Sequence, residues 1–240
     1  MRGGSILCSA ALAALAVAHP GRAINVDPAG RVYFIDTIRN RLWRVERDGR
    51  LTLIKDGVHS DALILGSAGE LYAAHDYYDG TAFRTRWWRV TASGTVTPAL
   101  AGEVPAHDAR PKDVDAQGNR YEADDAHHLV RRIAPRGEVT TVLRLRWPWY
   151  PTGVAVGPAG AVYVLERNGD YHGFWGAVNS LRPIAQLTGN PRIQVITPDG
   201  KTRSLVTLGH PGLGLLLAAA LATMPTLGYI RWWRRRRAQA

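Results

Sequence analysis

The chain has 240 residues, of which 46% are hydrophobic and 21% charged, and this balance excludes a disordered or collagen-like protein. A single cysteine excludes a disulfide scaffold and a cysteine-based metal cluster. The formal net charge of +10 falls to +4 between residues 19 and 210, because Arg2 and five C-terminal arginines account for the rest. A charge this small makes nucleic acid an unlikely partner.

Residues 1–18 have the three parts of a secretory signal. Arg2 precedes an apolar run from Ile6 to Ala18, and the run closes on the small residues Ala16-Val17-Ala18. The run is too short to span a bilayer, although a buried core helix has a similar composition. We therefore expect an N-terminal signal helix and export of the chain.

The C-terminal region predicts one transmembrane helix over residues 210–230. Gly212 to Ile230 is free of charge, and at 1.5 Å per residue its 19 positions reach about 28 Å, close to the hydrocarbon thickness. Arginines dominate the tail 231–240, so we expect a basic cytoplasmic tail and a single-pass protein of the cell membrane, with its body on the extracytoplasmic side. A buried C-terminal helix is the alternative, and a permanent anchor cannot be told from a processed bacterial sorting signal.

Four similar segments lie between these two ends. Each contains a glycine followed three residues later by tyrosine, and the glycines are 39, 49 and 42 residues apart. This spacing is the length of one propeller blade. The glycine and tyrosine pairs are Gly30 and Tyr33, Gly69 and Tyr72, Gly118 and Tyr121, and Gly160 and Tyr163.

A second glycine follows in each segment, at Gly49, Gly94, Gly137 and Gly200, between two alternating β-branched runs. Such runs, split by glycine turns, predict four short antiparallel strands per segment. One four-stranded sheet with two apolar faces buries them only against copies of itself. We predict an all-β fold, a β-propeller over residues 19–209 with four four-stranded blades at about 23–56, 61–100, 111–144 and 151–208.

The segments Asn119 to Val142 and Pro151 to Glu166 resemble NHL repeats and, more loosely, the gluconolactonase/SMP-30 and virginiamycin B lyase-like propellers. The resemblance covers residues 23–208. Propellers of these families commonly have six or seven blades, whereas this chain has room for four. The four blades therefore either close tightly or form an open ring that a second copy completes, which makes a homo-oligomer one expectation.

Six residues after the first glycine of each blade, the sequence places Asp36, His75, Asp124 and Glu166 at one end of the ring. Asp61 and Asp113 are expected at the same end. Oxygen ligands around an axial channel suit Ca²⁺ or another divalent metal, and in gluconolactonase-like relatives such a metal polarises a lactone. Glu166 and His75 are the catalytic candidates, and Asp36, Asp61, Asp113, Asp124 and Glu166 are the candidate metal ligands. The alternative is structural: an aspartate at this position caps the turn that follows it.

Two connections at this end are expected to be long loops. One carries Tyr77 and Tyr78, and the other, between Arg167 and Arg192, carries further aromatic residues. Long loops rich in aromatic residues favour ligand binding, by stacking on sugar, peptide or lipid, although such a loop can simply plug the channel. The candidate ligand-binding residues are Tyr77, Tyr78, Tyr171, His172, Phe174 and Trp175.

Two functions remain open from the sequence. The first is a membrane-tethered binding or scaffold module whose loop-rich face meets a membrane-proximal protein or an amphipathic small molecule. The second, implied by the resemblance, is a divalent-metal-dependent hydrolase or lyase of the gluconolactonase-like type. No nucleophile elbow, phosphate-binding loop or zinc-binding helix motif is present in the sequence to choose between them.

Overall fold

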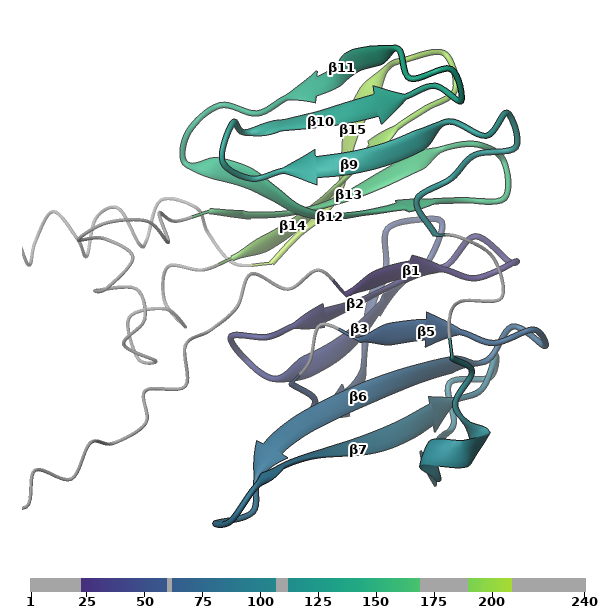
Figure 1. Cartoon of the computed structure of the whole chain (residues 1–240), viewed down its shortest axis with the longest axis vertical. Coiled ribbons are helices and arrows are strands. Elements are labelled where there is room, and N and C mark those ends of the chain that lie inside the picture. The colour runs from purple at the N-terminus through teal and green to yellow at the C-terminus, as the bar shows by residue number, and fades with distance from the viewer. Residues whose placement is uncertain (1–22, 60–61, 107–111, 169–189, 209–240) are drawn as a thin grey trace, which may run out of the picture.

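A computed structural model describes residues 23–59, 62–106, 112–168 and 190–208. Within these ranges the protein is all-β, with four antiparallel sheets and a single 3-10 turn, η1 (Ala101–Glu103) (Figure 1). The predicted signal 1–18 and membrane span 210–230 lie outside the described residues. Within the described ranges, no helix is long and apolar enough to cross a membrane.

The first two sheets each have four strands in the order of the chain. The first sheet contains β1 (Ile24–Val26), β2 (Val32–Asp36), β3 (Arg41–Val45) and β4 (Leu51–Asp56). The second contains β5 (Leu63–Leu65), β6 (Leu71–Tyr78), β7 (Phe83–Val90) and β8 (Val96–Ala99).

The third sheet has three strands and the fourth has four. The third contains β9 (Arg120–Asp124), β10 (Leu129–Ile133) and β11 (Val139–Arg144). The fourth contains β12 (Trp149–Val156), β13 (Val162–Asn168), β14 (Pro191–Ile196) and β15 (Thr202–Thr207).

The third sheet departs from the prediction of four strands. Where its first strand was expected, Val114 forms an isolated bridge with Arg120. Lys112 stands at the repeat position that the fully buried Ile24 occupies in the first sheet. A charged side chain cannot take that buried place without a partner, which accounts for the shortened pairing.

All eight repeat glycines adopt the left-handed backbone conformation, with φ between 76° and 93°. This confirms the turns that the repeats predict, because side chains other than glycine are strained at such φ values. The eight are Gly30, Gly49, Gly69, Gly94, Gly118, Gly137, Gly160 and Gly200.

The sheets pack face to face around their first strands, as blades of a propeller do. β1 lies against both β5 and β12, and β12 lies against β9. Three hydrophobic clusters fill these junctions, one between the first and second sheets, one between the first and fourth, and one between the third and fourth. Each cluster buries one face of two sheets, which is the main stabilisation available to such units.

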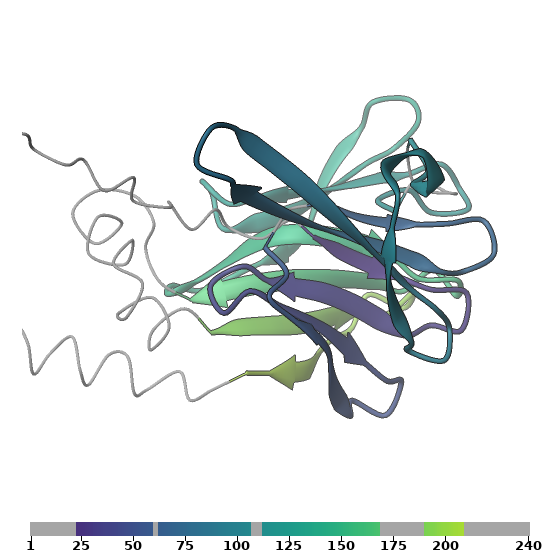
Figure 2. The same cartoon turned by 90° about the horizontal axis from the view of Figure 1, so that it is seen from below.

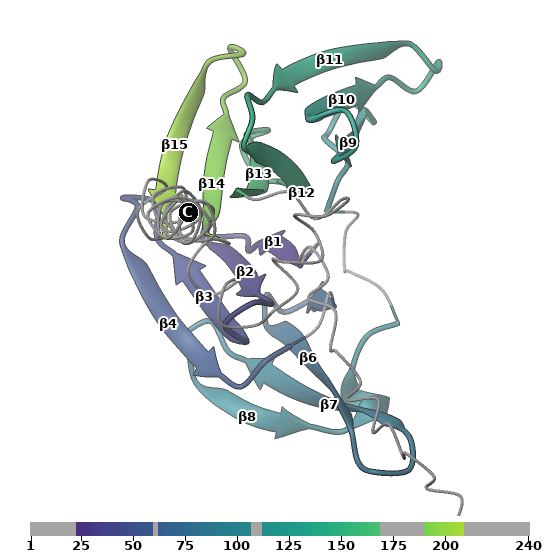
Figure 3. The same ribbon diagram turned by 90° about the vertical axis from the view of Figure 1, so that its left-hand side faces the viewer.

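The four sheets form an open arc rather than a closed ring. In the part of the chain that the structure describes, no hydrophobic cluster joins the second sheet to the third, and Figure 3 shows these two sheets at opposite ends of the arc. The first and last sheets are neighbours, so the opening falls in the middle of the sequence. Of the two arrangements expected from the sequence, the structure has the open one, and completion of the ring by a second copy stays a prediction.

The exposed ends of the arc are polar or partly covered. Strand alternation turns Arg120, Glu122 and Arg131 of the third sheet away from its neighbour, and these residues are exposed or half-buried. On the outward face of the second sheet, Tyr72 is nevertheless buried, and burial together with the charges of Glu70 and Glu103 raises its pKa. η1, which carries Glu103, thus lies near this face.

Candidate functional site

The end of the arc at which the second strand of each sheet finishes is called the rim. Asp36 ends β2, Asp124 ends β9, and His75 and Glu166 lie close to the ends of β6 and β13. The structure therefore places all four repeat positions at one end of the molecule, as the sequence predicts. They point into different junctions, however, and each has its own partners.

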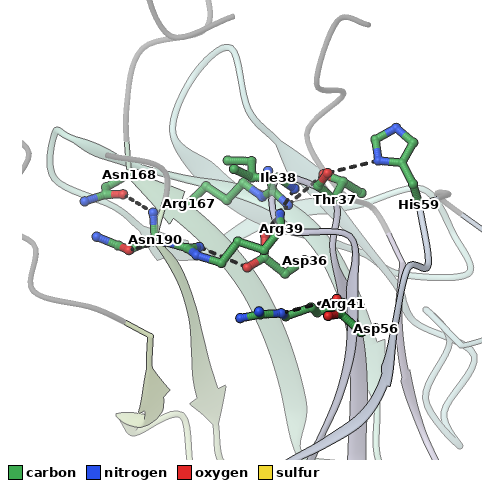
Figure 4. A network of polar contacts seen from close by, with 10 residues as sticks. All are labelled: Asp36, Thr37, Ile38, Arg39, Arg41, Asp56, His59, Arg167, Asn168 and Asn190. Atoms are coloured by element: carbon green, nitrogen blue, oxygen red, sulfur yellow. Dashed lines mark hydrogen bonds and ion pairs between the residues drawn. The ribbon is translucent and has the colours of Figure 1, made fainter. Parts of the chain in front are cut away.

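Asp36 is fully buried between the first and fourth sheets (Figure 4). Its carboxylate accepts the backbone N–H groups of Ile38 at 3.2 Å and Arg39 at 3.3 Å, so it caps the turn after β2. Arg39 Nη1 lies 2.9 Å from Oδ2, and the buried Arg167 Nη2 lies 3.8 Å from Oδ1. The turn-capping role weighed from the sequence is thus present, together with two cations.

Polar contacts extend this network across the junction. Arg167 Nη2 donates to Thr37 Oγ1 at 2.8 Å, and Arg39 Nη2 donates to Asn190 Oδ1 at 3.0 Å. The backbone N–H of Asn190 donates to Asn168 Oδ1 at 2.7 Å (Figure 4). These contacts hold the two ends of the fourth sheet's long connection against the turn after β2.

Glu166 is fully buried between the third and fourth sheets, where it forms an ion pair with Arg192. Arg192 Nε donates to Oε2 at 2.7 Å, and Nη2 donates to the same oxygen. Burial raises the pKa of Glu166 to about 7, while Arg192 opposes the shift. The guanidinium of Arg192 in turn lies 3.9 Å from the centre of the Trp149 ring.

Asp124 faces away from its neighbouring sheet, at the open end of the arc. It caps the turn after β9 by accepting the backbone N–H of His127 at 3.1 Å, and it pairs with Arg131. Partial burial acts to raise the pKa of Asp124, but hydrogen bonds from His127 and the charge of Arg131 hold it below its ordinary value. Asp124 therefore caps its turn as Asp36 does, but among the described residues it makes no polar contact with a second sheet.

His75 lies at the junction of the first and second sheets. Its Nδ1 accepts the backbone N–H of His59 at 3.0 Å, which fixes the neutral ring with its proton on Nε2. Nδ1 of His59 is 2.9 Å from both the Thr37 carbonyl and Asn40 Oδ1. Burial, followed by the charges of His59 and Arg86, lowers the pKa of His75.

The rim carboxylates are separated by these junctions. Across the described ranges, no three His, Cys, Asp or Glu side chains form a group that could hold a metal ion. Asp113 lies beside Val114, whose isolated bridge with Arg120 stands where a first strand of the third sheet was expected. Asp61 is outside the described residues. Among the residues weighed as catalytic, Glu166 alone combines full burial with a pKa near neutrality.

The first of the two expected loops proves to be strand. β6 continues through His75, Asp76, Tyr77 and Tyr78, and β7 pairs with it from Phe83 onward. The loop prediction was wrong for these residues because their alternating side chains keep the period of two that a hairpin needs. Tyr77 is half-buried, while Tyr78 is exposed.

The second expected loop follows β13, and most of it lies outside the described residues. This holds for Tyr171, His172, Phe174 and Trp175, whose ligand-binding role stays a prediction. The strand β13 itself runs to Asn168, so the connection to β14 is shorter at its start than the sequence indicated.

Sequence reasoning missed the cations of the site. Arg39, Arg167 and Arg192 are the residues that neutralise Asp36 and Glu166. Arg192 sits directly opposite Glu166 in the pairing of β13 with β14, a register that could have been read from the repeats. Arg167 contacts Thr37, which lies 130 positions earlier in the chain, and no local pattern indicates such a contact.

No protein-family model and no curated protein matches this sequence. Solved structures do match. Virginiamycin B lyase from Staphylococcus aureus is 18% identical with a TM-score of 0.27, and the match covers 76% of this chain and 54% of that one. Regucalcin, a calcium-binding protein from Agrobacterium tumefaciens, is 13% identical with a TM-score of 0.31, over 81% of this chain and 75% of that one.

A gluconolactonase from Xanthomonas campestris is 14% identical with a TM-score of 0.25, and the match covers 76% of this chain and 60% of that one. The chain spans just over half the length of the streptogramin B and virginiamycin B lyases that it matches. These matched structures are lyases, a gluconolactonase and regucalcin, the kinds of protein that the sequence resembles. At such low identities and TM-scores they bring no substrate or activity to this chain.

Proposed function

We propose that this protein is an exported, membrane-anchored β-propeller that works as a binding or scaffold module through its rim. The observation that carries the proposal is that the acidic and imidazole side chains of the rim are all engaged in contacts within the fold. Asp36, Asp124 and Glu166 are each neutralised by an arginine of the fold, and the ring of His75 accepts a backbone N–H. Side chains engaged in this way support turns, strand pairs and the junction between the first and fourth sheets, and this favours a rigid platform over a reaction centre.

The binding groups of such a platform are aromatic. Tyr77 and Tyr78 extend from the second sheet at the rim, and the candidates Tyr171, His172, Phe174 and Trp175 follow β13 in the sequence. Aromatic rings with a polar edge suit a membrane-proximal protein or an amphipathic small molecule. The predicted span 210–230 supports a location at the cell membrane on its extracytoplasmic side.

Site-specific photo-cross-linking tests the binding function. Benzoylphenylalanine replaces Tyr77 in the full chain, and in a matched variant it replaces Ser93, which is exposed at the opposite end of the same sheet. Irradiation of intact membranes is expected to give a discrete adduct from position 77 and none from position 93. Adducts at neither position, or equally at both, would argue against a binding rim.

One observation favours a second function, a divalent-metal-dependent hydrolase or lyase. A buried carboxyl group with a pKa of about 7 can take up or release a proton at neutral pH, as a general base does. Metal content and lactone hydrolysis are measured for the full chain, for Glu166→Gln, and for Glu138→Gln as an exposed control. Stoichiometric metal, with hydrolysis lost only in Glu166→Gln, would replace the scaffold proposal with the enzyme.

A further inference from the structure

The large aromatic side chains that are exposed all lie at the rim. Among the described residues, three large aromatic side chains are more than a third exposed: Tyr78 at 60%, Phe83 at 83% and Trp147 at 67%. Tyr78 and Phe83 form the last pair of the β6–β7 hairpin, and Trp147 precedes β12, which begins at the rim opposite Asn168. Each of these rings is exposed to water at the same end of the protein, where it is available to contact another surface.

The hairpin tip is built to hold its aromatic pair outward. The rings of Tyr78 and Phe83 lie 5.4 Å apart. Asp79 closes the turn beyond them by accepting the backbone N–H groups of Thr81 at 2.8 Å and Ala82 at 2.9 Å, and it pairs with Arg84 at 2.8 Å. The pair is thus presented by an ordered turn.

Trp147 is held in a similar way on the other side of the opening. The N–H of Leu145 donates to the His128 carbonyl at 2.8 Å, and the N–H of Trp149 donates to the Arg146 carbonyl at 3.0 Å, so a closed turn carries Trp147. Tyr78 and Phe83 belong to the second sheet, and Trp147 joins the third sheet to the fourth. The aromatic residues therefore stand at separate points of the rim rather than in one patch.

The chain leaves the described part of the protein at this same end. The N–H of Leu208 donates to the carbonyl of Pro191 at the start of β14, and β14 begins at the rim. Figures 1 and 2 show the tip of the β6–β7 hairpin and the end of β15 on one side of the molecule. Only Gly209, His210 and Pro211 separate Leu208 from the uncharged run, and three residues reach about 10 Å at most.

We propose that the rim rests on the lipid bilayer itself, with Tyr78, Phe83 and Trp147 in the headgroup region of the outer leaflet. This inference rests on the proposed membrane anchor and adds the orientation of the body above it. Tryptophan and tyrosine favour the membrane interface, where one side of the ring is apolar and the other hydrated. Arg146 is exposed beside Trp147 and suits phosphate groups of lipids, whereas Arg84 is paired with Asp79. Ligands would then reach the rim along the plane of the membrane.

Fluorescence quenching in lipid vesicles tests this orientation. The full chain, with Cys8 replaced by serine, is labelled with an environment-sensitive dye at Thr81→Cys in the hairpin turn or at Ser93→Cys at the opposite end of the same sheet. Vesicles contain phosphatidylcholine, phosphatidylglycerol and a nitroxide-bearing lipid. We expect several-fold stronger quenching at position 81 than at position 93. Equal, weak quenching at the two positions would overturn the proposal.

A pair of variants connects the quenching to the aromatic residues. Phe83→Ser combined with Trp147→Ser is expected to remove most of the quenching at position 81, while Val139→Ser, an equally exposed apolar residue at the far end, leaves it unchanged. Because all three side chains are exposed, circular dichroism should show the fold intact. Unchanged quenching in the double variant would also overturn the proposal.

Alkaline carbonate extraction separates this inference from the anchor. A chain that carbonate does not release, yet whose position 81 is not quenched, retains the anchor and refutes the rim contact. A chain that carbonate releases, but that shows quenching at position 81 in neutral buffer, refutes the anchor and retains the rim contact. Release together with no quenching refutes both.

Discussion

Asp36 and Arg167 stand 131 positions apart in the chain, and their side chains, both without exposed surface, approach to 3.8 Å between Oδ1 and Nη2. The contact joins the first sheet to the last. Among the described residues, each of the two sheets contains strands of its own segment alone, so side-chain contacts must hold this junction. The buried ion pair, Arg39 and the hydrophobic cluster of the junction take that role.

Replacing Asp36 should therefore destabilise the whole arc. Asp36→Asn leaves the positive charge of Arg167 buried with a weaker partner, and such losses cost about 3 to 5 kcal/mol. Urea unfolding of the full chain measures the change. The matched control is Asp199→Asn, which breaks an exposed pair with Lys201 and should change the free energy of unfolding far less than Asp36→Asn does. Equal effects of the two substitutions would contradict a structural role for the pair.

Glu166 predicts a pH dependence of stability with a definite sign. Its pKa is about 7 in the folded protein, above the value of 4.5 for an unburied glutamate, so the folded state binds more protons between these pH values. The contribution of Glu166 to the free energy of unfolding should therefore fall by up to about 3 kcal/mol as the pH rises from 4.5 to 7.

The difference between the wild type and Glu166→Gln isolates this contribution, because other titrating groups are common to both proteins. Urea unfolding at a series of pH values should show the wild type losing stability relative to the variant as the pH rises through this window. A constant difference would mean that Arg192 keeps the glutamate ionised throughout.

His75 should make the protein less stable as the pH falls, which is opposite to the effect of Glu166. Its pKa is lowered by burial, so the unfolded state binds the proton more readily, and stability should fall as the pH drops below about 6.5. Protonation of Nδ1 would also remove the acceptor for the His59 N–H.

Two substitutions separate the titration from the hydrogen bond. His75→Asn offers an amide oxygen to the His59 N–H and cannot titrate, so it should keep its stability at pH 7 and lose the acid sensitivity. His75→Leu should be about 1 kcal/mol less stable than His75→Asn at every pH, because the His59 N–H remains without its acceptor and neither variant titrates at this position. Thermal unfolding at pH 5 and 7 compares them, and acid sensitivity retained in both variants would exclude His75 as its source.

Replacing either of two glycines in one turn by alanine should destabilise the protein, for a different reason at each position. A Cβ on Gly157 would lie 2.8 Å from the Tyr163 ring, whereas a Cβ on Gly160 would meet no atom within 4 Å, but its φ of 76° strains any side chain. We expect both to destabilise the protein, Gly160→Ala by about 1 to 2 kcal/mol. Adding Tyr163→Leu should partly rescue Gly157→Ala and leave the cost of Gly160→Ala unchanged. Thermal unfolding of the four variants measures this, and rescue of both would contradict it.

Much of the fold could be predicted because its determinants are local. A glycine with positive φ at each of eight turns fixes where strands begin and end, and the steps between glycines fix the number of sheets. The same repeats place Asp36, His75, Asp124 and Glu166 at one end. The first strand of the third sheet was predicted too long because the repeat pattern was extended over Lys112, whose charge cannot be buried there.

The partners and the burial of the rim residues could not be predicted from the repeats. Equivalent positions face different junctions, since the partners that surround them come from distant segments. Asp36 meets Arg167 of the last sheet, whereas Asp124 faces the opening and pairs within its own sheet. Nothing in the local sequence records which sheets become neighbours, and this arrangement decides which charges are buried.

The opening between the second and third sheets has an evolutionary consequence. In a ring whose free seam lay between the first and last sheets, a new unit would be added at a terminus of the chain. In this protein the opening lies in the connection after β8. Duplication of the segment that forms the second or the third sheet would therefore place a new sheet at the opening. The three occupied junctions would remain intact, and the arc could gain sheets without a stage in which its existing core is broken.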